Sequence, residues 1–568
     1  MGSAPRKSQR VGLIAIIAFA SLLATSVAYA ATGDLTQKAG TAGCVSETGT
    51  GGACQDGEAL DAAAGVAVSP DGTSAYVASI AGGALLTGGV AIFDRNTSTG
   101  ALTQKAGTAG CISESGGAPC QDGEALGGAF AVAVSPDGAS VYVASQTSDA
   151  IAIFDRNTFT GALTQKAGTA GCVSEDGTGS ACQDGVALDS ATGVAVSPDG
   201  ASVYVASETS NAVAIFDRNT STGALTQKAG TAGCVSEDGT ASACQDGAAL
   251  TGAIGLAVSP DASSVYVASS TSNAVAIFDR NTSTGALTQK AGMAGCVSEL
   301  GGACQDGQAL VGAFGVAVSP DGTSVYAASD TSDAVAIFDR NTSNGELTQK
   351  MGTAGCVSEL GVVCQDGVAL DGARGVAVSP DGSFVYVAST VSDAVATLDR
   401  NTSTGALTQR AGTAGCVSET GTGGSCQDGV ALDGARSAAV SPNGASVYAV
   451  SDESDAVAIF DREPPPIPPT PAPEPEPGDT APPDTQITKG PKDKTKKKTA
   501  TFEFSANEPG VTFNCVLDGK QEFKACTSPL KVKVKKGKHS FQVQARDAAG
   551  NLDATPASDS WKVKKKRK

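Results

Sequence analysis

The sequence predicts an all-β fold, a closed seven-bladed β-propeller followed by a small β-sandwich. Three observations support the propeller. A unit of roughly 60 residues occurs seven times, each unit holds four short segments of β character, and the first outer segment precedes every inner one. Repeats of this length are typical of solenoids and propellers. Four antiparallel strands per repeat describe one propeller blade.

One representative unit runs from residue 193 to 229, GVAVSPDGASVYVASETSNAVAIFDRNTSTGALTQKA. Its β segments are 194–196, 202–206, 212–216 and 224–227. They are separated by Ser-Pro-Asp-Gly, by a polar Ser/Thr/Asn stretch and by Asp-Arg-Asn-Thr-Ser-Thr-Gly, all of which favour turns. We therefore expect each unit to form one blade.

The order of the segments predicts how the ring closes. The inner segment occurs seven times, starting at Val66, Val132, Val194, Leu256, Val316, Val376 and Ala438. The outer segment Gly-x-Leu-Thr-Gln first appears at 33–37, before any inner segment, and last at 405–409, with three more segments after it. We expect the first copy to complete the last blade, which removes exposed sheet edges. An open solenoid is the alternative, but it would need caps that the sequence lacks.

The N-terminus predicts export. Arg6, Lys7 and Arg10 precede an uncharged apolar run at 11–27 and an Ala-Tyr-Ala ending at residue 30. This pattern is typical of a cleaved signal peptide at 1–30. The alternative is an uncleaved anchor, because about 20 apolar residues can span a bilayer. We expect the signal peptide to be cleaved and the mature chain to have no membrane span. The protein is then secreted and extracellular, and association with the cell surface is left open.

The 16 cysteines fall into eight local pairs. In an exported chain this pattern predicts disulfides. Zinc is the alternative, but the spacings vary and the one histidine, His539, lies outside the repeats. The predicted pairs are Cys44 with Cys54, Cys111 with Cys120, Cys172 with Cys182, Cys234 with Cys244, Cys296 with Cys304, Cys356 with Cys364, Cys416 with Cys426, and Cys515 with Cys526.

Charge divides the chain. The net charge is -19, yet residues 481–568 hold 20 Lys and Arg against 9 Asp and Glu, a net charge of +11. The acidic body excludes nucleic acid as its partner, because phosphate binding needs clustered Lys and Arg. We expect the Lys-rich end to be solvated; contact with acidic wall polymers or membrane surfaces is the alternative.

The repeat carries a family resemblance. Val-Ala-Val-Ser-Pro-Asp-Gly-x-Ser-Val-Tyr-Val-Ala-Ser followed by Ala-Val-Ala-Ile-Phe-Asp-Arg resembles the blade signature of YVTN and lactonase-type seven-bladed propellers, many of them secreted bacterial proteins. The resemblance covers 31–462 and implies the fold. It implies an activity only weakly, since such propellers include 6-phosphogluconolactonase-like enzymes and many proteins without a known reaction.

The remainder predicts a spacer and a second domain. Residues 463–483 are rich in proline and are expected to form an extended linker. Residues 484–563 alternate in hydrophobicity over stretches such as 500–504 and 541–545, and they resemble bacterial immunoglobulin-like domains, small β-sandwiches. We expect Cys515 and Cys526 to staple a hairpin, and 564–568 to form a basic tail.

Candidate ligand-binding residues lie where the repeats differ. Two residues before each inner segment, at the predicted mouth of the central channel, the copies read Ala64, Phe130, Thr192, Ile254, Phe314, Arg374 and Arg436. Three positions earlier, four copies carry Asp61, Asp189, Asp371 and Asp433. In one reading, the two arginines hold an anionic or carbonyl oxygen while Phe130 and Phe314 pack its apolar part. In the other, each arginine pairs with a nearby aspartate and caps the rim.

Blade topology predicts which loops share a face. The Cys-stapled loops should lie beside the Ser-x-Thr-Ser-Asp/Asn loops, and this stapled face is the candidate binding face. The acidic Ser-Glu-Asp-Gly and Cys-Gln-Asp-Gly stretches match no calcium-loop spacing, so we expect no metal and no cofactor, and we attribute their acidity to solubility.

Several absences favour a protein without catalysis. The propeller contains no histidine, the cysteines are expected to be paired, and the inner Val-Ala-Val segments carry no Asp, Asn or Glu as calcium-dependent lactonase propellers require. We expect a monomeric secreted or cell-surface binding protein whose partner is a cell-wall polymer, a glycan or a protein. The alternative is a lactonase-like hydrolase that acts at the channel mouth.

Overall fold

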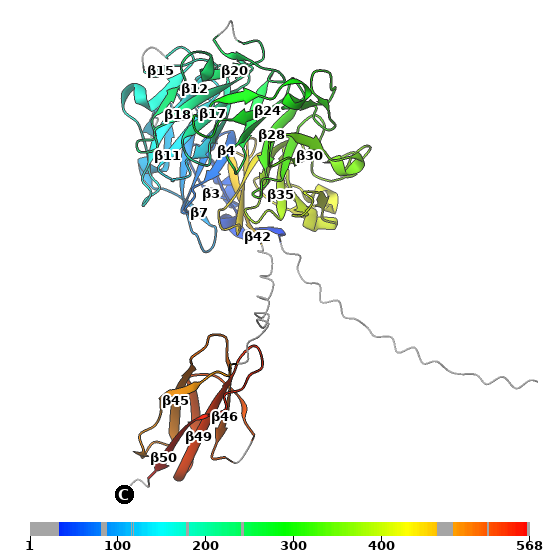
Figure 1. Ribbon diagram of the computed structural model, residues 1–568. Coiled ribbons are helices and arrows are strands. Elements are labelled where there is room, and N and C mark those ends of the chain that lie inside the picture. The colour runs from blue at the N-terminus through cyan, green and yellow to red at the C-terminus, as the bar shows by residue number, and fades with distance from the viewer. Residues whose placement is uncertain are drawn as a thin grey trace, which may run out of the picture. The chain divides into compact units, whose positions relative to one another are not determined.

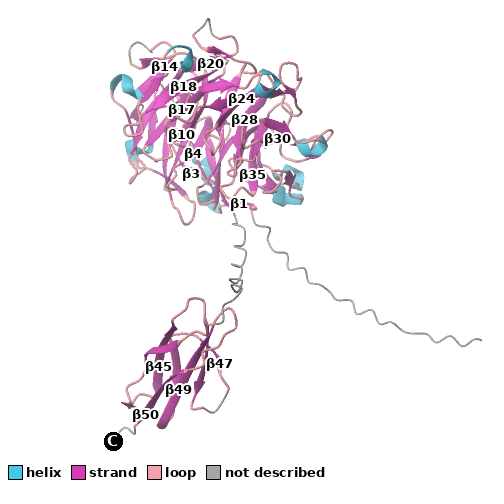
Figure 2. Cartoon of the chain, in the orientation of Figure 1, coloured by secondary structure: helices cyan, strands magenta, loops and turns pink. Residues whose placement is uncertain are grey.

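The computed structural model describes residues 33–80, 88–114, 116, 119–177, 181–239, 243–462, 481–519 and 522–564. The predicted signal peptide, most of the linker and the tail beyond Lys564 lie outside these residues. The chain divides into two compact units, Met1–Pro464 and Pro465–Lys568. Across the described residues the regular structure is strand, with short 3-10 turns (Figures 1 and 2). No described helix is long and apolar enough to cross a membrane.

The first unit contains seven six-stranded sheets, as expected for a seven-bladed propeller. We number the blades by their inner strands. Those strands are β4 (Ala63–Val68), β10 (Ala129–Val134), β16 (Ala191–Val196), β22 (Ala253–Val258), β28 (Ala313–Val318), β34 (Ala373–Val378) and β40 (Ala435–Val440).

Each inner strand pairs with an antiparallel second strand, which pairs with a third. The second strands are β5 (Ser74–Ser79), β11 (Ser140–Ser145), β17 (Ser202–Ser207), β23 (Ser264–Ser269), β29 (Ser324–Ser329), β35 (Phe384–Ser389) and β41 (Ser446–Ser451). The third strands are β6 (Gly89–Arg95), β12 (Ala150–Arg156), β18 (Ala212–Arg218), β24 (Ala274–Arg280), β30 (Ala334–Arg340), β36 (Ala394–Arg400) and β42 (Ala456–Arg462).

The outer strand differs from the prediction because it is split. In blade 3, β19 pairs with the end of β18 through Arg218↔Leu225, and β20 pairs with its start through Ala212↔Ser236. A 3-10 turn of sequence Gly-Thr-Ala-Gly separates the two pieces, and its first glycine, Gly230, has φ +60°. A sixth strand, β21, runs parallel to β20. The prediction of four strands per blade therefore missed two short ones.

The split strands share one pattern in all blades. The Leu-Thr-Gln pieces are β1 (Leu35–Gln37), β7 (Leu102–Gln104), β13 (Leu163–Gln165), β19 (Leu225–Gln227), β25 (Leu287–Gln289), β31 (Leu347–Gln349) and β37 (Leu407–Gln409). The Cys-x-Ser pieces are β2 (Cys44–Ser46), β8 (Cys111–Ser113), β14 (Cys172–Ser174), β20 (Cys234–Ser236), β26 (Cys296–Ser298), β32 (Cys356–Ser358) and β38 (Cys416–Ser418). The sixth strands are β3 (Gln55–Asp56), β9 (Gln121–Asp122), β15 (Gln183–Asp184), β21 (Gln245–Asp246), β27 (Gln305–Asp306), β33 (Gln365–Asp366) and β39 (Gln427–Asp428).

The 3-10 turns also recur. Those between the outer pieces are η1 (Gly40–Gly43), η4 (Gly107–Gly110), η5 (Gly168–Gly171), η7 (Gly230–Gly233), η9 (Gly292–Gly295), η10 (Gly352–Gly355) and η11 (Gly412–Gly415). Two more, η2 (Gly49–Gly52) and η12 (Gly421–Gly424), lie inside stapled loops.

The ring closes as the sequence predicts. Strands β1 and β2 pair with β42, through Leu35↔Arg462 and Cys44↔Ala458. Blade 7 therefore joins the beginning of the propeller to its end, and the closed ring is confirmed.

The core lies between neighbouring blades. One cluster, for example, joins Tyr142 and Ile153 of blade 2 to Val203 and Phe216 of blade 3, all fully buried. The inner strands approach so closely that a Cβ on Gly193 would lie 2.2 Å from the Ile254 carbonyl oxygen. Glycine at this position permits the close contact of backbones around the channel.

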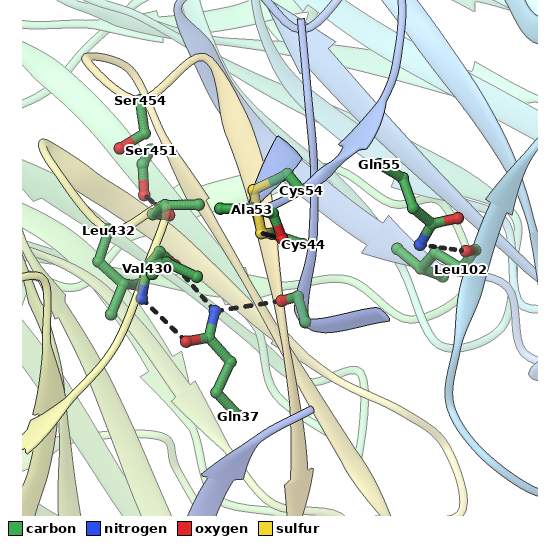
Figure 3. Close-up of a disulfide and its surroundings, with 12 residues drawn as sticks. Gln37, Cys44, Ala53, Cys54, Gln55, Leu102, Val430, Leu432, Ser451 and Ser454 are labelled. Carbon is green, nitrogen blue, oxygen red and sulfur yellow. Dashed lines mark hydrogen bonds between the residues drawn. A yellow bond between two sulfur atoms is a disulfide. The ribbon is translucent and has the colours of Figure 1, made fainter. Parts of the chain in front are cut away.

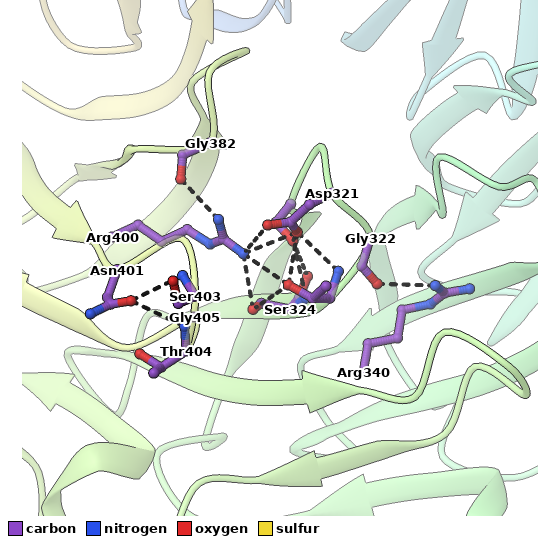
Figure 4. A network of polar contacts seen from close by, with 12 residues as sticks. Asp321, Gly322, Ser324, Arg340, Gly382, Arg400, Asn401, Ser403, Thr404 and Gly405 are labelled. Atoms are coloured by element: carbon purple, nitrogen blue, oxygen red, sulfur yellow. Dashed lines mark hydrogen bonds and ion pairs between the residues drawn. The ribbon is translucent and has the colours of Figure 1, made fainter. Parts of the chain in front are cut away.

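A buried arginine links each pair of blades at the end of the third strand. Arg400 of blade 6 donates from Nε to the Tyr326 hydroxyl at 2.6 Å and forms an ion pair with Asp321 at 2.9 Å, both in blade 5. Its Nη1 donates to the Gly382 carbonyl at 2.9 Å (Figure 4). Tyr326 in turn donates to the Gly405 carbonyl of blade 6 at 2.8 Å. A fully buried guanidinium is thus paired and hydrogen-bonded, which offsets its desolvation.

This arginine clamp recurs at the other junctions, with two departures. At the junction of blades 7 and 1, Asn443 stands in the position of the aspartate and accepts from Arg95 at 3.3 Å. At the junction of blades 6 and 7, Phe384 stands where other second strands have serine, and the Tyr386 hydroxyl and Arg462 Nε are buried without partners. The Phe384 ring instead lies 4.7 Å from the Arg462 guanidinium and 5.0 Å from that of Arg410.

All eight predicted disulfides are formed, with the predicted partners. In the propeller each one closes a loop within its own blade, across Cα–Cα distances of 4.7 to 4.8 Å. Cys44 is bonded to Cys54, Cys111 to Cys120, Cys172 to Cys182, Cys234 to Cys244, Cys296 to Cys304, Cys356 to Cys364, and Cys416 to Cys426. No free cysteine remains among the described residues, so the alternative of zinc ligation by these side chains is excluded there. Disulfides of this number indicate an oxidising, extracytoplasmic compartment.

The first and the last disulfide of the chain lie in different surroundings. Figure 3 shows the first, Cys44–Cys54, near Gln37, whose amide donates to the Val430 carbonyl at 2.8 Å. In the second unit, Cys515–Cys526 joins the paired strands β46 (Thr512–Leu517) and β47 (Lys524–Cys526). The stapled hairpin is therefore confirmed.

The second unit consists of two sheets around one apolar core. One sheet orders β43 (Thr485–Lys489), β45 (Thr499–Ala506) and β48 (Leu530–Lys533). The other orders β44 (Lys494–Thr495), β50 (Ala557–Val563), β49 (Gly537–Arg546), β46 and β47. The core contains Phe502, Phe541 and Trp561, with the two Phe rings stacked at 4.0 Å.

The clamp yields a matched stability test. We expect Tyr326→Phe to lower the free energy of unfolding by about 1 to 3 kcal/mol, because it leaves the buried Arg400 Nε and Gly405 carbonyl without a partner. Tyr386→Phe should have little effect, because that hydroxyl already lacks a partner. Urea unfolding followed by far-ultraviolet circular dichroism measures both, and equal losses would contradict the assigned role of the clamp.

Candidate functional site at the channel mouth

The central channel contains a cavity of about 190 Å³, lined by the first residues of all seven inner strands. This is smaller than the roughly 300 Å³ at which typical ligand pockets begin, so it suits only a small molecule. All seven variable residues predicted at the mouth line this cavity: Ala64, Phe130, Thr192, Ile254, Phe314, Arg374 and Arg436.

The apolar members meet across the channel. The rings of Phe130 and Phe314 lie 6.2 Å apart, and Phe130 packs with Ala64 and Ile254 in one buried cluster. The arginines stack on these rings, with Arg436 at 4.8 Å from Phe130 and Arg374 at 5.2 Å from Phe314. The mouth thus joins an apolar surface to two cations, and each cation is favoured by the ring face beneath it.

The arginines pair with aspartates, but not with those that the sequence suggested. Arg436 forms an ion pair and hydrogen bond with Asp452 of its own blade. Arg374 has its Nε 3.6 Å from the Asp330 carboxylate of blade 5, too far for a hydrogen bond. Asp330 and Asp452 both directly follow a second strand, so the loop after that strand supplies the partner.

Both guanidinium groups keep an unused donor. The Nε atoms of Arg374 and Arg436 are buried and have no hydrogen-bond partner. Burial lowers the pKa of Arg436 and Arg374 lowers it further, whereas Asp452 and Glu208 act in the opposite direction. Buried donors without partners are uncommon in native proteins. The Nε of Arg462 also lacks a partner, so the distinguishing feature of this pair is its position in the cavity. The pair is suited to an oxygen ligand.

Sequence reasoning missed a second variable ring. The residue that follows each second strand differs from blade to blade, and the seven copies are Ile80, Gln146, Glu208, Ser270, Asp330, Thr390 and Asp452. Comparing the repeats at this position, as was done for the inner segment, would have found it. Gln146 donates to the Glu208 carboxylate at 3.4 Å, and Glu208 lies near enough to Arg436 to affect its pKa.

The four predicted aspartates lie elsewhere. Asp61, Asp189, Asp371 and Asp433 are absent from the lining of the cavity and lie in the loops that enter the inner strands, each facing a carboxylate of the preceding blade. In blade 3, Asp149 accepts from the Ser190 amide at 2.7 Å, and Glu175 accepts from the Leu188 amide at 2.5 Å. Asp189 therefore sits between two carboxylates that anchor its own loop.

These contacts place two kinds of loop on one face. The Glu175 amide, which follows a Cys-x-Ser strand, donates to the Asp149 carbonyl in the loop between the second and third strands, at 3.0 Å. The stapled loops and the Ser/Thr-rich loops therefore share a face, as predicted. Within the described part of the chain, no group of three or more His, Cys, Asp or Glu is arranged to hold a metal ion.

The chain matches one family model over part of its length. A family model described as lactonase, 7-bladed beta-propeller, matches this chain. The match covers residues 23–174 and 315–421, which include Phe130 and Arg374. It agrees with the resemblance that the blade signature carries. No curated protein matches the chain.

The chain is distantly similar to several solved structures. The periplasmic gluconolactonase of Pseudomonas aeruginosa is 17% identical with a TM-score of 0.43, over 61% of this chain and 83% of that one. A candidate 6-phosphogluconolactonase of Bacteroides uniformis is 18% identical with a TM-score of 0.42, over 61% and 82%. The hydrazine synthase of Kuenenia stuttgartiensis is 16% identical with a TM-score of 0.41, over 71% and 97%.

Two sets of carboxylates make stability depend on pH in opposite directions. Burial raises the pKa of Asp189 and of Asp371, and the neighbouring Asp149 and Asp333 raise these pKa values further. Partial burial alone would raise the pKa of Asp321, but hydrogen bonds from Ser319, Thr323 and Arg400 lower it to about 2. A carboxyl group whose pKa is raised by folding stabilises the fold at low pH, and this stabilisation is lost as the pH rises through the raised pKa. A carboxyl group whose pKa is lowered by folding stabilises the fold at neutral pH, and this stabilisation is lost as the pH falls through the lowered pKa.

We therefore expect the melting temperature to rise as the pH falls from 7 toward about 4, the value for an unfolded aspartate, and to drop between about 4 and 2. Asp189→Asn with Asp371→Asn should raise the melting temperature at pH 7 and reduce the rise on acidification. Thermal melts across this range measure both chains. A double variant with an unchanged pH profile would contradict the role of these carboxylates.

Proposed function

We propose that the propeller hydrolyses a small lactone, a cyclic ester, at the mouth of its central channel. The observation that carries the proposal is the pair of buried, unpartnered Nε donors of Arg374 and Arg436, which line the cavity in a ring of otherwise similar blades. Glu208 does not line this cavity, but its charge acts on Arg436. The match to the lactonase family model supports the same reaction class.

The residues divide into three roles. Arg374 and Arg436 donate to the lactone carbonyl oxygen, where negative charge develops as the ester is attacked. Phe130 and Phe314 pack against the carbon atoms of the ring. Glu208 accepts a proton from the attacking water. The water oxygen bonds to the carbonyl carbon, the ring C–O bond breaks, and the leaving alkoxide takes the proton held by Glu208 to give the hydroxy acid.

A second candidate is the non-catalytic binding protein that the near-identical blades suggested. The observation in its favour is the stapled face, where seven disulfide loops, one at the outer strands of each blade, repeat similar chemistry around the ring and could contact a repetitive polymer. In that case the arginines would hold an anionic end group and would turn nothing over. The family match favours hydrolysis between the two.

Hydrolysis of a panel of sugar lactones and acyl homoserine lactones, followed with a pH indicator, tests the proposal. We expect turnover of at least one lactone by the purified chain. Glu208→Gln should lower kcat by at least about 100-fold, because the general base is lost. The Arg374→Ala, Arg436→Ala double variant should lower kcat by about 100- to 1,000-fold through loss of the oxyanion donors.

Glu124→Gln is the matched control, because it makes the same chemical change at an exposed residue of the loop between β9 and β10. It should keep the activity of the parent. No turnover above buffer with any lactone would reject the hydrolase, and binding of a polymer that needs Arg374 and Arg436 would then favour the second candidate.

A further inference from the structure

Lysines gather at one end of the second unit. We call this surface the basic end. It is formed by ten exposed lysines, Lys494, Lys496, Lys497, Lys498, Lys533, Lys535, Lys536, Lys538, Lys562 and Lys564. The acidic body of the propeller has no comparable cluster of cations in its sequence, so this surface is a separate feature from the channel mouth.

Strand pairing brings these lysines together. Thr499 of β45 lies opposite Lys533 of β48, and Gly537 of β49 lies opposite Val563 of β50. Lys494 lies beside Lys562 through the parallel pairing of β44 and β50. The turns at 496–498 and 534–536 connect the two sheets at this end, and the Val534 amide donates to the Lys498 carbonyl at 2.8 Å. Both sheets therefore contribute to the basic end.

The positive charge of the basic end is not balanced. Among the described residues none of the ten lysines forms an ion pair, whereas elsewhere in the chain Lys489 pairs with Glu503 at 2.7 Å and Lys228 pairs with Asp217. Asp493 lies next to Lys494 and its carbonyl accepts from the Lys562 amide at 2.8 Å, and Asp518 is paired with His539 at 2.9 Å. Ten like charges repel one another, and a bound polyanion would relieve that repulsion.

The shape and chemistry of the basic end identify the partner. Its lysines come from both sheets and surround the end of the unit, so a flexible chain can contact more of them than a flat bilayer can. The described exposed large apolar residues of this unit, Phe523 and Leu552, lie on other segments, so nothing at the basic end inserts into a membrane. Trp561 is buried, so no ring is offered to nucleic acid bases.

We propose that the basic end binds a linear phosphodiester polymer through charge pairing between its lysines and the phosphates. Lysine is a strongly hydrated point charge that commonly binds phosphate, and a row of such charges recognises a repeated anion without selecting its sugar or alcohol. The inference is independent of lactone hydrolysis, since it concerns a different unit and a different ligand.

Binding of the full chain to fluorescent poly(glycerol phosphate), measured by anisotropy at several salt concentrations, tests the proposal. We expect binding that weakens as salt rises. The quadruple variant Lys533→Gln, Lys535→Gln, Lys536→Gln, Lys538→Gln should bind at least tenfold more weakly. The slope of log K against log salt concentration should also become shallower by about three, because each of the four lost phosphate contacts contributes about 0.7 to the slope.

The matched control removes the same charge from the propeller through Lys105→Gln, Lys166→Gln, Lys228→Gln and Lys290→Gln. Each of these lysines is paired with an aspartate and only 8 to 11% exposed, so it is not available to a polymer. The control should bind as the parent does, with circular dichroism showing that all three chains are folded. Equal loss in both variants, or no loss in the first, would overturn the proposal. So would tighter binding to vesicles of 30% phosphatidylglycerol in phosphatidylcholine than to the polymer.

Discussion

The buried arginine that ends each third strand holds the propeller together. Its guanidinium has no exposed surface at most junctions, so it must find its partners inside the protein. Those partners, a tyrosine hydroxyl and an aspartate, belong to the preceding blade, and removing one partner of a buried charge typically costs several kcal/mol. Each blade is thereby fixed to its neighbour at the same depth and angle, and the rigid ring that results sets the positions of the residues at the channel mouth.

The residues that repeat around the ring are different from those that form the candidate site. The clamp, the stapled loops and the apolar faces between blades use the same residue types around the ring, because equivalent junctions impose equivalent packing. At the channel mouth the residue types differ from blade to blade. Its two variable rings place cations in blades 6 and 7, aromatic rings in blades 2 and 5, and carboxylates in blades 3, 5 and 7. A directional site can therefore arise on a nearly symmetrical scaffold through a few side chains, with no change in backbone.

The features that could be predicted from the sequence were those decided locally or by repetition. The number of blades, the closing strand and the eight disulfides follow from spacing alone. The split of the outer strand was missed because its cause is one 3-10 turn at a glycine of positive φ, which the apolar pattern does not reveal. The partners of Arg374 and Arg436 were missed because Asp330 and Asp452 come from the loops after the second strands, and the approach of these loops to the channel is decided by the three-dimensional fold.

The junction of blades 6 and 7 has a consequence for how the chain finds its register. Seven similar Leu-Thr-Gln segments offer β1 several nearly equivalent places to pair during folding. At its native place Asp34 pairs with Arg410, where the other six blades carry lysine, and Gly33 lies against Phe384 so closely that a Cβ would meet the ring at 2.1 Å. Only this junction offers both the arginine and the aromatic ring. Because the point of closure is chemically unlike the other junctions, β1 is favoured to pair in its native blade and not in another, similar blade.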